Sequence, residues 1–179
     1  MRVFIFGTGR CGTVSIAAAL KHATNYTVEH EGYSPDWQYP DHHIEVNPQL
    51  RAVVGGWPME DYRNDMFVWL QRDREKVADS YRRLDGGMWL DYWWEICPTV
   101  RPRSDIAAAR IAVEWIEKQC FDAFRSRAQT QRVILGIDRI KNKDEFPALW
   151  SRIGAIGELA AALRVFDTPM NTSAQRGDG

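Results

Sequence analysis

The chain has 179 residues, enough for one domain with a substantial core and too few for two domains of ordinary size. It carries 23 basic and 24 acidic side chains, and a net charge of -1 gives none of the broad positive field that sequence-independent nucleic-acid binding requires. We therefore expect one globular domain over residues 1–167, with no nucleic-acid partner. Residues 168–179 are polar and predict either a flexible tail or a loop that contacts a cofactor.

The basic residues are mostly arginines, which make up 18 of the 23. The planar guanidinium group suits phosphate, sulfate and carboxylate ligands, although codon usage in a GC-rich genome would give the same bias. The three cysteines lack both the CxxC pattern and the Cys/His spacing of metal sites, which argues against a disulfide framework and a zinc site. No apolar run reaches the length of a signal-peptide core or a membrane span. We expect a cytoplasmic protein with no membrane partner.

Runs of β-branched and aromatic residues alternate along the chain with stretches of helix-forming residues. The runs are nearly continuous, as in strands that are buried on both faces of a parallel sheet. The predicted strands are residues 2–6, 26–30, 66–71 and 132–137, and the predicted helices are residues 15–21, 74–84, 105–124, 147–150 and 156–163. This alternation predicts the α/β class, with three layers around a central parallel sheet of about four or five strands.

Two long segments separate these elements, residues 32–62 and residues 85–104. Loops of that length in a compact domain are usually functional or disordered. The second contains four aromatic residues that either line a pocket for a sugar or an aromatic ring, or simply cover the sheet. They are Trp89, Tyr92, Trp93 and Trp94.

A glycine-rich loop, residues 7–15, joins the first predicted strand to the first predicted helix. In an α/β fold this connection directs backbone N-H groups and the positive end of a helix dipole toward an anion. The spacing of Gly7 and Gly12 is that of a Walker A loop, but Thr13 occupies the position of the essential Lys. Arg10 is the only cation within the loop. A phosphate-like ligand is therefore expected, held without the Walker A lysine.

The order Arg10, Cys11, Gly12, Thr13 resembles the 5'-phosphosulfate loop of sulfotransferases that use 3'-phosphoadenylyl sulfate (PAPS). In that family a basic residue, a small residue, Gly, and Thr or Ser follow the first strand. The resemblance implies a P-loop version of the three-layer fold, in which Arg10 and the loop amides hold the 5'-phosphate and the sulfuryl group. The cofactor-binding residues that it implies here are Gly9, Arg10, Cys11, Gly12, Thr13, Val14 and Ser15. Val14 stands where many members carry a second hydroxyl residue, a role open to Ser15.

The same family has a 3'-phosphate motif, an Arg at the end of a strand and a Ser eight residues later. Arg72 and Ser80 have this spacing at the end of the third predicted strand, with Arg74 in place of the usual Pro. The resemblance implies that both bind the 3'-phosphate. Many members add an Arg-Gly contact from a C-terminal loop, which here would be Arg176, unless the tail is disordered. Residues 133–140 resemble both the family's late strand, which ends in an acidic residue, and a Walker B strand.

Sulfuryl transfer needs a base for the acceptor proton and fixed positive groups at the leaving phosphate. We expect the second strand beside the first, which would bring its end near the transferring group. By resemblance Glu31 is the predicted base, with His30 second and Arg10 at the leaving phosphate. The alternative is that Glu29 and Glu31 face solvent while His30 packs or caps. The sulfuryl group carries less negative charge than a γ-phosphoryl group, so no metal is expected.

A further polar cluster consists of Asp41, His42, His43 and Glu45. Adjacent histidines on a strand do not easily face one ion, and no third anchor has the spacing of a zinc site, so a polar loop is the preferred interpretation.

The leading functional hypothesis is a transferase that moves a sulfuryl group from PAPS to a hydroxyl or amine of a small-molecule or carbohydrate acceptor, leaving adenosine 3',5'-bisphosphate. One alternative is a P-loop kinase or NTPase, favoured by the Walker-like spacing and opposed by the missing Lys. Another is a non-catalytic nucleotide-binding module, since 179 residues is short for this family.

Overall fold

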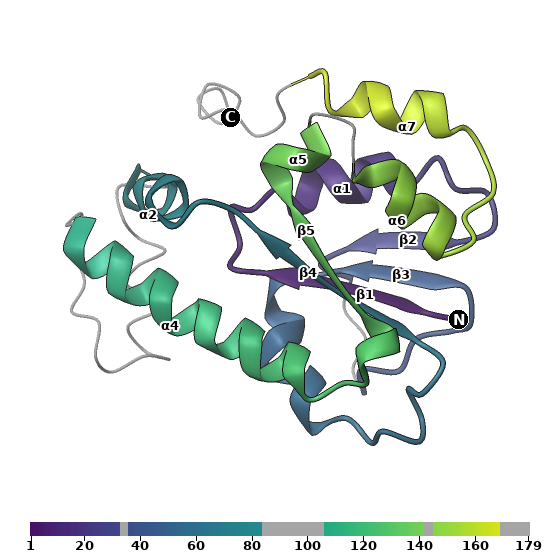
Figure 1. The fold of residues 1–179 in the computed structure, drawn as a ribbon, viewed down its shortest axis with the longest axis horizontal. Helices are drawn as coiled ribbons and strands as arrows, with labels where there is room; N and C mark the ends of the chain where they lie inside the picture. Colours follow the sequence, from purple (N-terminus) through teal and green to yellow (C-terminus); the bar gives the residue numbers. More distant parts are fainter. Residues whose placement is uncertain (33–35, 84–105, 142–144, 169–179) are drawn as a thin grey trace.

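The computed structural model of the chain describes residues 1–32, 36–83, 106–141 and 145–168, which form one parallel sheet with helices on both faces (Figure 1). Its five strands lie in the order β2-β3-β1-β4-β5, so the first strand is central. The α/β class and the parallel sheet of about four or five strands are thereby confirmed. The strands are β1 (Val3–Gly7), β2 (Thr27–His30), β3 (His43–Val46), β4 (Met66–Gln71) and β5 (Arg132–Gly136).

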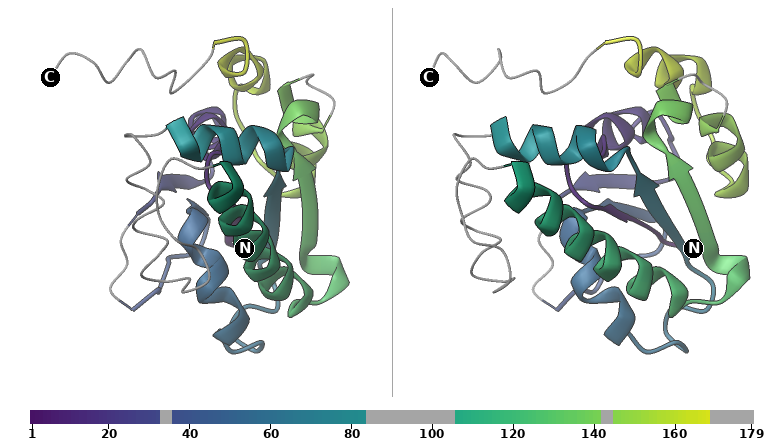
Figure 2. Two further views of the ribbon diagram at one scale, coloured as in Figure 1. Left: turned by 90° about the vertical axis from the view of Figure 1, so that its left-hand side faces the viewer. Right: turned by 60° about the vertical axis from the view of Figure 1, so that its left-hand side comes forward.

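Side chains alternate along β1, which is buried over its whole length. Val3 and Ile5 point toward one face of the sheet, which is covered by α1 (Thr13–Leu20), α5 (Ile137–Lys141), α6 (Phe146–Arg152) and α7 (Leu159–Val165). Phe4 and Phe6 point toward the other face, which is covered by α2 (Arg74–Arg83), α4 (Ile106–Arg125) and the 3-10 helices η1 (Pro48–Ala52) and η2 (Val54–Gly56). Figure 2 shows these two helical layers from the side.

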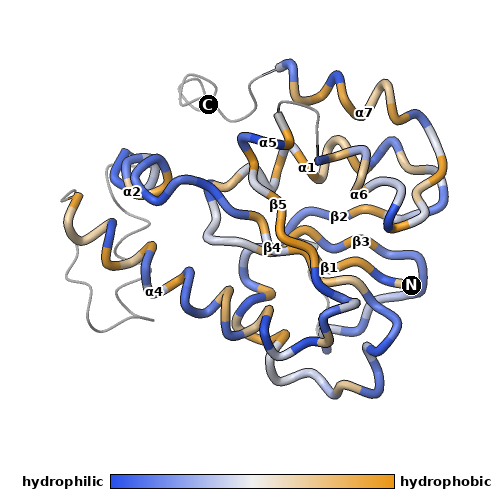
Figure 3. Tube along the Cα trace, viewed as in Figure 1, coloured by the Kyte–Doolittle hydropathy of each residue, from blue (hydrophilic) through white to orange (hydrophobic). Residues whose placement is uncertain are grey.

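The strands β1, β4 and β5 are mostly hydrophobic, whereas helix α2 is largely hydrophilic (Figure 3). Helix α2 is anchored by the buried residues Val77, Ala78 and Tyr81, which belong to the same cluster as Ala109 and Val113 of α4. The predicted helices lie within a few residues of the observed ones, and the largest shift is that of the last, which begins at Leu159 rather than at residue 156.

The prediction of a loop over residues 32–62 is wrong, because this segment contains β3, η1 and η2. Strand β3 pairs with both β1 and β2, so the expectation that β2 lies beside β1 is also wrong. All four β3 residues are buried, including His43 and Glu45. The strand was missed because two of its four side chains are polar in sequence and are nevertheless buried. The end of β2 is therefore one strand farther from the glycine loop than expected.

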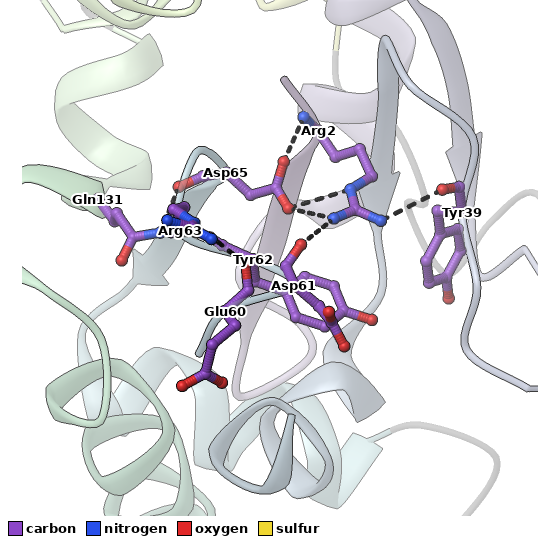
Figure 4. A network of polar contacts seen from close by, with 8 residues as sticks. All are labelled: Arg2, Tyr39, Glu60, Asp61, Tyr62, Arg63, Asp65 and Gln131. Carbon is purple, nitrogen blue, oxygen red and sulfur yellow. Dashed lines mark hydrogen bonds and ion pairs between the residues drawn. The ribbon is translucent and has the colours of Figure 1, made fainter. Parts of the chain in front are cut away.

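At the amino-terminal end of the central strand, Arg2 anchors the start of β1 (Figure 4). Its backbone N-H and its guanidinium Nε donate to the two oxygens of the buried Asp65 carboxylate, at 2.7 and 3.0 Å. Nη1 donates to the carbonyl of Tyr39 at 3.4 Å, and Nη2 to that of Asp61 at 2.7 Å. These contacts fix the chain on either side of β3 relative to β1, and they hold Tyr39 in place.

Candidate functional site

The glycine loop turns through left-handed backbone conformations between β1 and α1. Gly9, Arg10 and Gly12 have φ values of 74°, 51° and 89°. Left-handed residues in a turn direct neighbouring amides into a concave surface that binds anions. Gly12 caps α1, and the first turn of this eight-residue helix contains no acidic side chain that would offset its dipole. The backbone geometry is therefore typical of a phosphate-binding loop.

Close packing restricts the loop glycines. A Cβ on Gly7 would lie 2.5 Å from Cys11 Sγ and 2.8 Å from the Leu70 carbonyl oxygen. A Cβ on Gly12 would collide with the Ile137 side chain, and one on Gly9 with the Tyr81 hydroxyl. The loop thus requires glycine both for its backbone conformation and for its fit against α2 and α5.

Three hydrogen bonds join the glycine loop to the segment that follows β4. Arg10 Nε donates to Ser80 Oγ at 3.0 Å, and Arg72 Nη1 donates to the Arg10 carbonyl at 2.7 Å. The buried Tyr81 hydroxyl donates to the Thr8 carbonyl. The structure therefore brings Arg10 together with Arg72 and Ser80, which lie 62 and 70 positions farther along the chain.

The position of this cluster follows from the order of the strands. β1 and β4 are adjacent and parallel, with Gly7 paired to Leu70, so their carboxyl ends lie side by side. The helix after β1 covers one face of the sheet and the helix after β4 covers the other. Open α/β sheets bind ligands in the crevice at such a switch point.

Cys11 is a structural residue of the loop. It is fully buried, and burial raises the pKa of its thiol to about 11, so the thiol is protonated at neutral pH. Thr13 is also buried, whereas Val14 and Ser15 are half-buried in the first turn of α1. A thiolate nucleophile at Cys11 is inconsistent with this environment.

Arg51 is a residue of this region that the sequence analysis missed. It lies on η1 with 5% of its surface exposed, and its Nη1 donates to the carbonyls of Gly7, at 3.5 Å, and of Pro48. The guanidinium is a buried positive charge behind the glycine loop. It was missed because β3, which brings η1 under the loop, was not predicted. A signal was present in the sequence, since Arg51 stands within the apolar run from Leu50 to Val54.

Strand β5 confirms the expected late strand, and the short helix α5 follows it directly. Asp138 lies in the first turn of α5, and its carboxylate is 3.2 Å from the Lys76 ammonium of α2. Both side chains are more than half exposed, so the ion pair adds little stability. The pair adds one cation and one carboxylate at the carboxyl ends of β4 and β5, next to the glycine loop's end of the sheet.

The two predicted bases differ in environment. Glu31 is exposed and has a φ of 55°, so the strand ends with a sharp change of direction. Val28 packs against the cluster on the α1 face, which places His30, two residues later, on the same face. His30 Nε2 is buried and has no hydrogen-bond partner among the described residues. The choice of Glu31 depended on β2 lying beside β1, and in the structure β3 lies between these two strands.

A second group of polar side chains lies at the β2-β3 edge of the sheet. Within the described part of the chain, Glu29, His43 and Glu45 each offer one ligand atom, all within 4.8 Å of one another. The interpretation of residues 41–45 as a polar loop is therefore wrong in part, because His43 and Glu45 belong to β3 while Asp41 and His42 are exposed. The predicted Arg176 and the aromatic residues 89–94 lie outside the described residues.

Comparison with models of known protein families and with curated proteins found no match. The resemblance to sulfotransferases therefore depends on the two motifs. None of the helices in the described segments is long and apolar enough to cross a membrane. The cytoplasmic location stays a prediction.

Replacing Gly9 with Ala tests the packing of the loop. A residue with a Cβ is strained in the left-handed region by roughly 1 to 2 kcal/mol. Displacing the Tyr81 hydroxyl from the Thr8 carbonyl adds about 1 kcal/mol for a lost buried hydrogen bond. We expect Gly9→Ala to lower the free energy of unfolding by roughly 2 kcal/mol or more in urea titrations.

Gly56→Ala is the matched control, since no atom lies within 4 Å of its added Cβ. This substitution should be neutral or should stabilise the protein by less than about 1 kcal/mol. Equal unfolding midpoints for the two variants would show that Gly9 is neither held in the left-handed conformation nor packed against Tyr81 in solution.

Proposed function

We propose that the protein is a PAPS-dependent sulfotransferase that uses the glycine loop and the start of α2 as its donor site. The observation that supports this most is the convergence of two motifs that were identified separately in the sequence. Arg10 belongs to the first motif, Arg72 and Ser80 belong to the second, and direct hydrogen bonds join them. A donor with phosphate groups at both its 5' and 3' positions needs two neighbouring anion sites of this kind.

The residues divide naturally between the two phosphate positions. The loop amides and Arg10 are suited to the 5'-phosphosulfate, and Arg72 and Ser80 to the 3'-phosphate. In the transfer, the acceptor oxygen bonds to sulfur while the bond from sulfur to the bridging phosphate oxygen breaks, and that oxygen leaves with the electron pair. Positive charge and N-H groups that are fixed before the reaction stabilise the charge that develops on the leaving phosphate. The acceptor proton passes to a base of the protein.

A kinase or NTPase and a non-catalytic nucleotide-binding module remain the competing proposals. Both share the fold and the loop, so the shape of the site does not separate them from a sulfotransferase. The chemistry of the ligand does, because a kinase binds ATP with Mg2+ whereas the proposed site prefers a 3'-phosphorylated nucleotide without metal. A binding module would hold the nucleotide and transfer nothing.

Adenosine 3',5'-bisphosphate is expected to stabilise the protein in the presence of a chelator. Ligand at a hundred times its dissociation constant adds roughly 2.7 kcal/mol to the free energy of unfolding, which appears as an upward shift of the melting temperature. Thermal melts with the bisphosphate, with ATP alone and with ATP plus Mg2+ make the comparison. A shift from Mg-ATP and none from millimolar bisphosphate would favour the kinase and overturn the proposal.

Arg72→Ala is expected to weaken the bisphosphate by roughly 10- to 150-fold, corresponding to about 1.5 to 3 kcal/mol for a hydrogen bond to a charged group. Adenosine 5'-phosphate should lose much less, since it lacks the 3'-phosphate. Arg74→Ala is the control, because the exposed Arg74 pairs with Glu117 of α4. Isothermal titration of both ligands gives the measurement.

Arg72 also donates a hydrogen bond to the carbonyl of Arg10, so its replacement could weaken ligands through the loop alone. If the residue acts only by shaping the glycine loop, both ligands weaken equally, and the 3'-phosphate assignment fails.

The observed environments shift our preference for the base from Glu31 to His30. His30 has a buried Nε2 without a partner among the described residues and lies on the face that α1 covers, whereas Glu31 is exposed. His30→Gln should lower turnover by roughly 10² to 10⁴ with unchanged bisphosphate affinity, which is the usual contribution of a positioned base. Glu31→Gln should have a smaller effect. Turnover with PAPS and a panel of phenols, alcohols and sugars measures both variants, and the reverse ranking would restore Glu31.

A further inference from the structure

The β2-β3 edge brings three ionisable side chains from two strands to one face of the sheet. Glu29 of β2 pairs directly with Glu45 of β3, so their side chains share a face, and His43 lies two residues before Glu45 on that same face. This is the face of Phe4, which pairs with Glu45 from the other side. The cluster is therefore built into the register of the sheet.

Close distances connect the three groups. His43 Nε2 lies 3.3 Å from Glu45 Oε2, and the backbone N-H of Gly32 donates to Glu45 Oε1 at 3.0 Å. Gly32 also approaches Glu29, because a Cβ at Gly32 would lie 2.9 Å from Glu45 Oε2 and would collide with Glu29 Oε2. One oxygen of each carboxylate thus faces the region next to the imidazole.

Burial makes this arrangement costly without a cation. Glu45 has 0% of its surface exposed and His43 has 2%, whereas Glu29 is exposed. A buried carboxylate beside a second carboxylate is destabilised by desolvation and by repulsion unless positive charge lies close. A divalent cation bound between the two carboxylates would offset both negative charges.

Unpartnered polar groups at the same place provide an independent observation. The Tyr39 ring stacks on His43 with its centroid 5.0 Å away, Tyr39 is only 8% exposed, and its hydroxyl has no hydrogen-bond partner in the described chain. His43 Nδ1 is likewise buried without a partner among the described residues. Such orphaned groups beside a cluster of ligand atoms indicate a missing polar occupant.

We infer that Glu29, His43 and Glu45 bind a divalent transition-metal cation with the ligand preferences of Zn2+. Two ligand atoms at about 2.0 to 2.2 Å from a tetrahedral ion are separated by about 3.3 to 3.6 Å, which matches the pair from His43 and Glu45. An imidazole ligand favours a transition metal over Mg2+ or Ca2+. A water molecule would complete the coordination on the exposed side of Glu29. This inference does not depend on the proposed transfer reaction.

Such an ion would cross-link the edge strand β2 to β3. Strand β2 has four residues and pairs on one side with β3, so a ligand from each strand would cross-link the pair. The link would also fix residues 30–32, which include the two candidate bases. The sequence did not indicate the site, because its third ligand, Glu29, comes from a different strand.

The test is to remove metal from the protein with a chelator and then to titrate it with Zn2+, and with Mg2+ for comparison. Calorimetry measures the affinity, and thermal unfolding measures the change in stability. We expect one Zn2+ per chain, a higher melting temperature with Zn2+, and binding of Mg2+ at least a hundredfold weaker. Glu29→Gln should weaken Zn2+ at least tenfold, and because Glu29 is exposed this variant should still fold. His43→Gln should abolish binding. Asp41→Asn, an exposed carboxylate two positions before His43, is the matched control and should bind like the parent.

Absence of saturable Zn2+ binding at neutral pH would overturn the inference. Equal affinities in Glu29→Gln and Asp41→Asn would also overturn it, because the ion would then bind elsewhere. The result is independent of bisphosphate binding, which is measured with chelator present.

Discussion

The hydrogen bond from Tyr81 to the Thr8 carbonyl is the contact on which the geometry of the proposed donor site depends. It joins the glycine loop, which turns through left-handed residues, to a helix that is itself anchored in the core. Burial raises the pKa of the Tyr81 hydroxyl, so it remains protonated and stays a donor over the physiological range. Val77 and Ala78 hold α2 on α4, and this packing determines where Ser80 and Tyr81 meet the loop. The site thus derives its shape from the hydrophobic cluster below it.

The parallel register separates the two polar regions of the molecule. Glu45 pairs with Phe4, and Gly7 follows Phe4 by three residues. At a strand rise of about 3.3 Å per residue, the edge cluster lies roughly 10 Å before the glycine loop along the strands, and one strand to the side. The two regions therefore belong to the same half of the sheet but not to one pocket. An ion at the edge would act on the proposed transfer site through the position of β2.

Several features of the fold could be predicted because they depend on local patterns. The glycine loop has its own spacing, β4 is a continuous apolar run, and α4 shows a regular hydrophobic stripe. Arg10, Arg72 and Ser80 could be connected because each stands at a fixed offset from such an element. Strand β3 could not be predicted. Two of its four residues are polar, and these are buried by residues distant in sequence. Because β3 was not predicted, the strand order could not be derived. For the same reason the position of Arg51 and the pairing of Glu29 with the edge cluster were not recognised.

The hydrogen bond between Arg10 and Ser80 has a consequence for how fast and how tightly an anion is bound. A long arginine side chain in water samples many rotamers, and fixing it on a ligand costs entropy. Here Nε is already held, so much of that ordering is complete before any encounter. An incoming phosphate exchanges one partner of the guanidinium for another instead of immobilising a free side chain. Such preorganisation strengthens the binding of an anion mainly by lowering the entropic cost of association, and it favours slow release of the anion over unusually rapid capture.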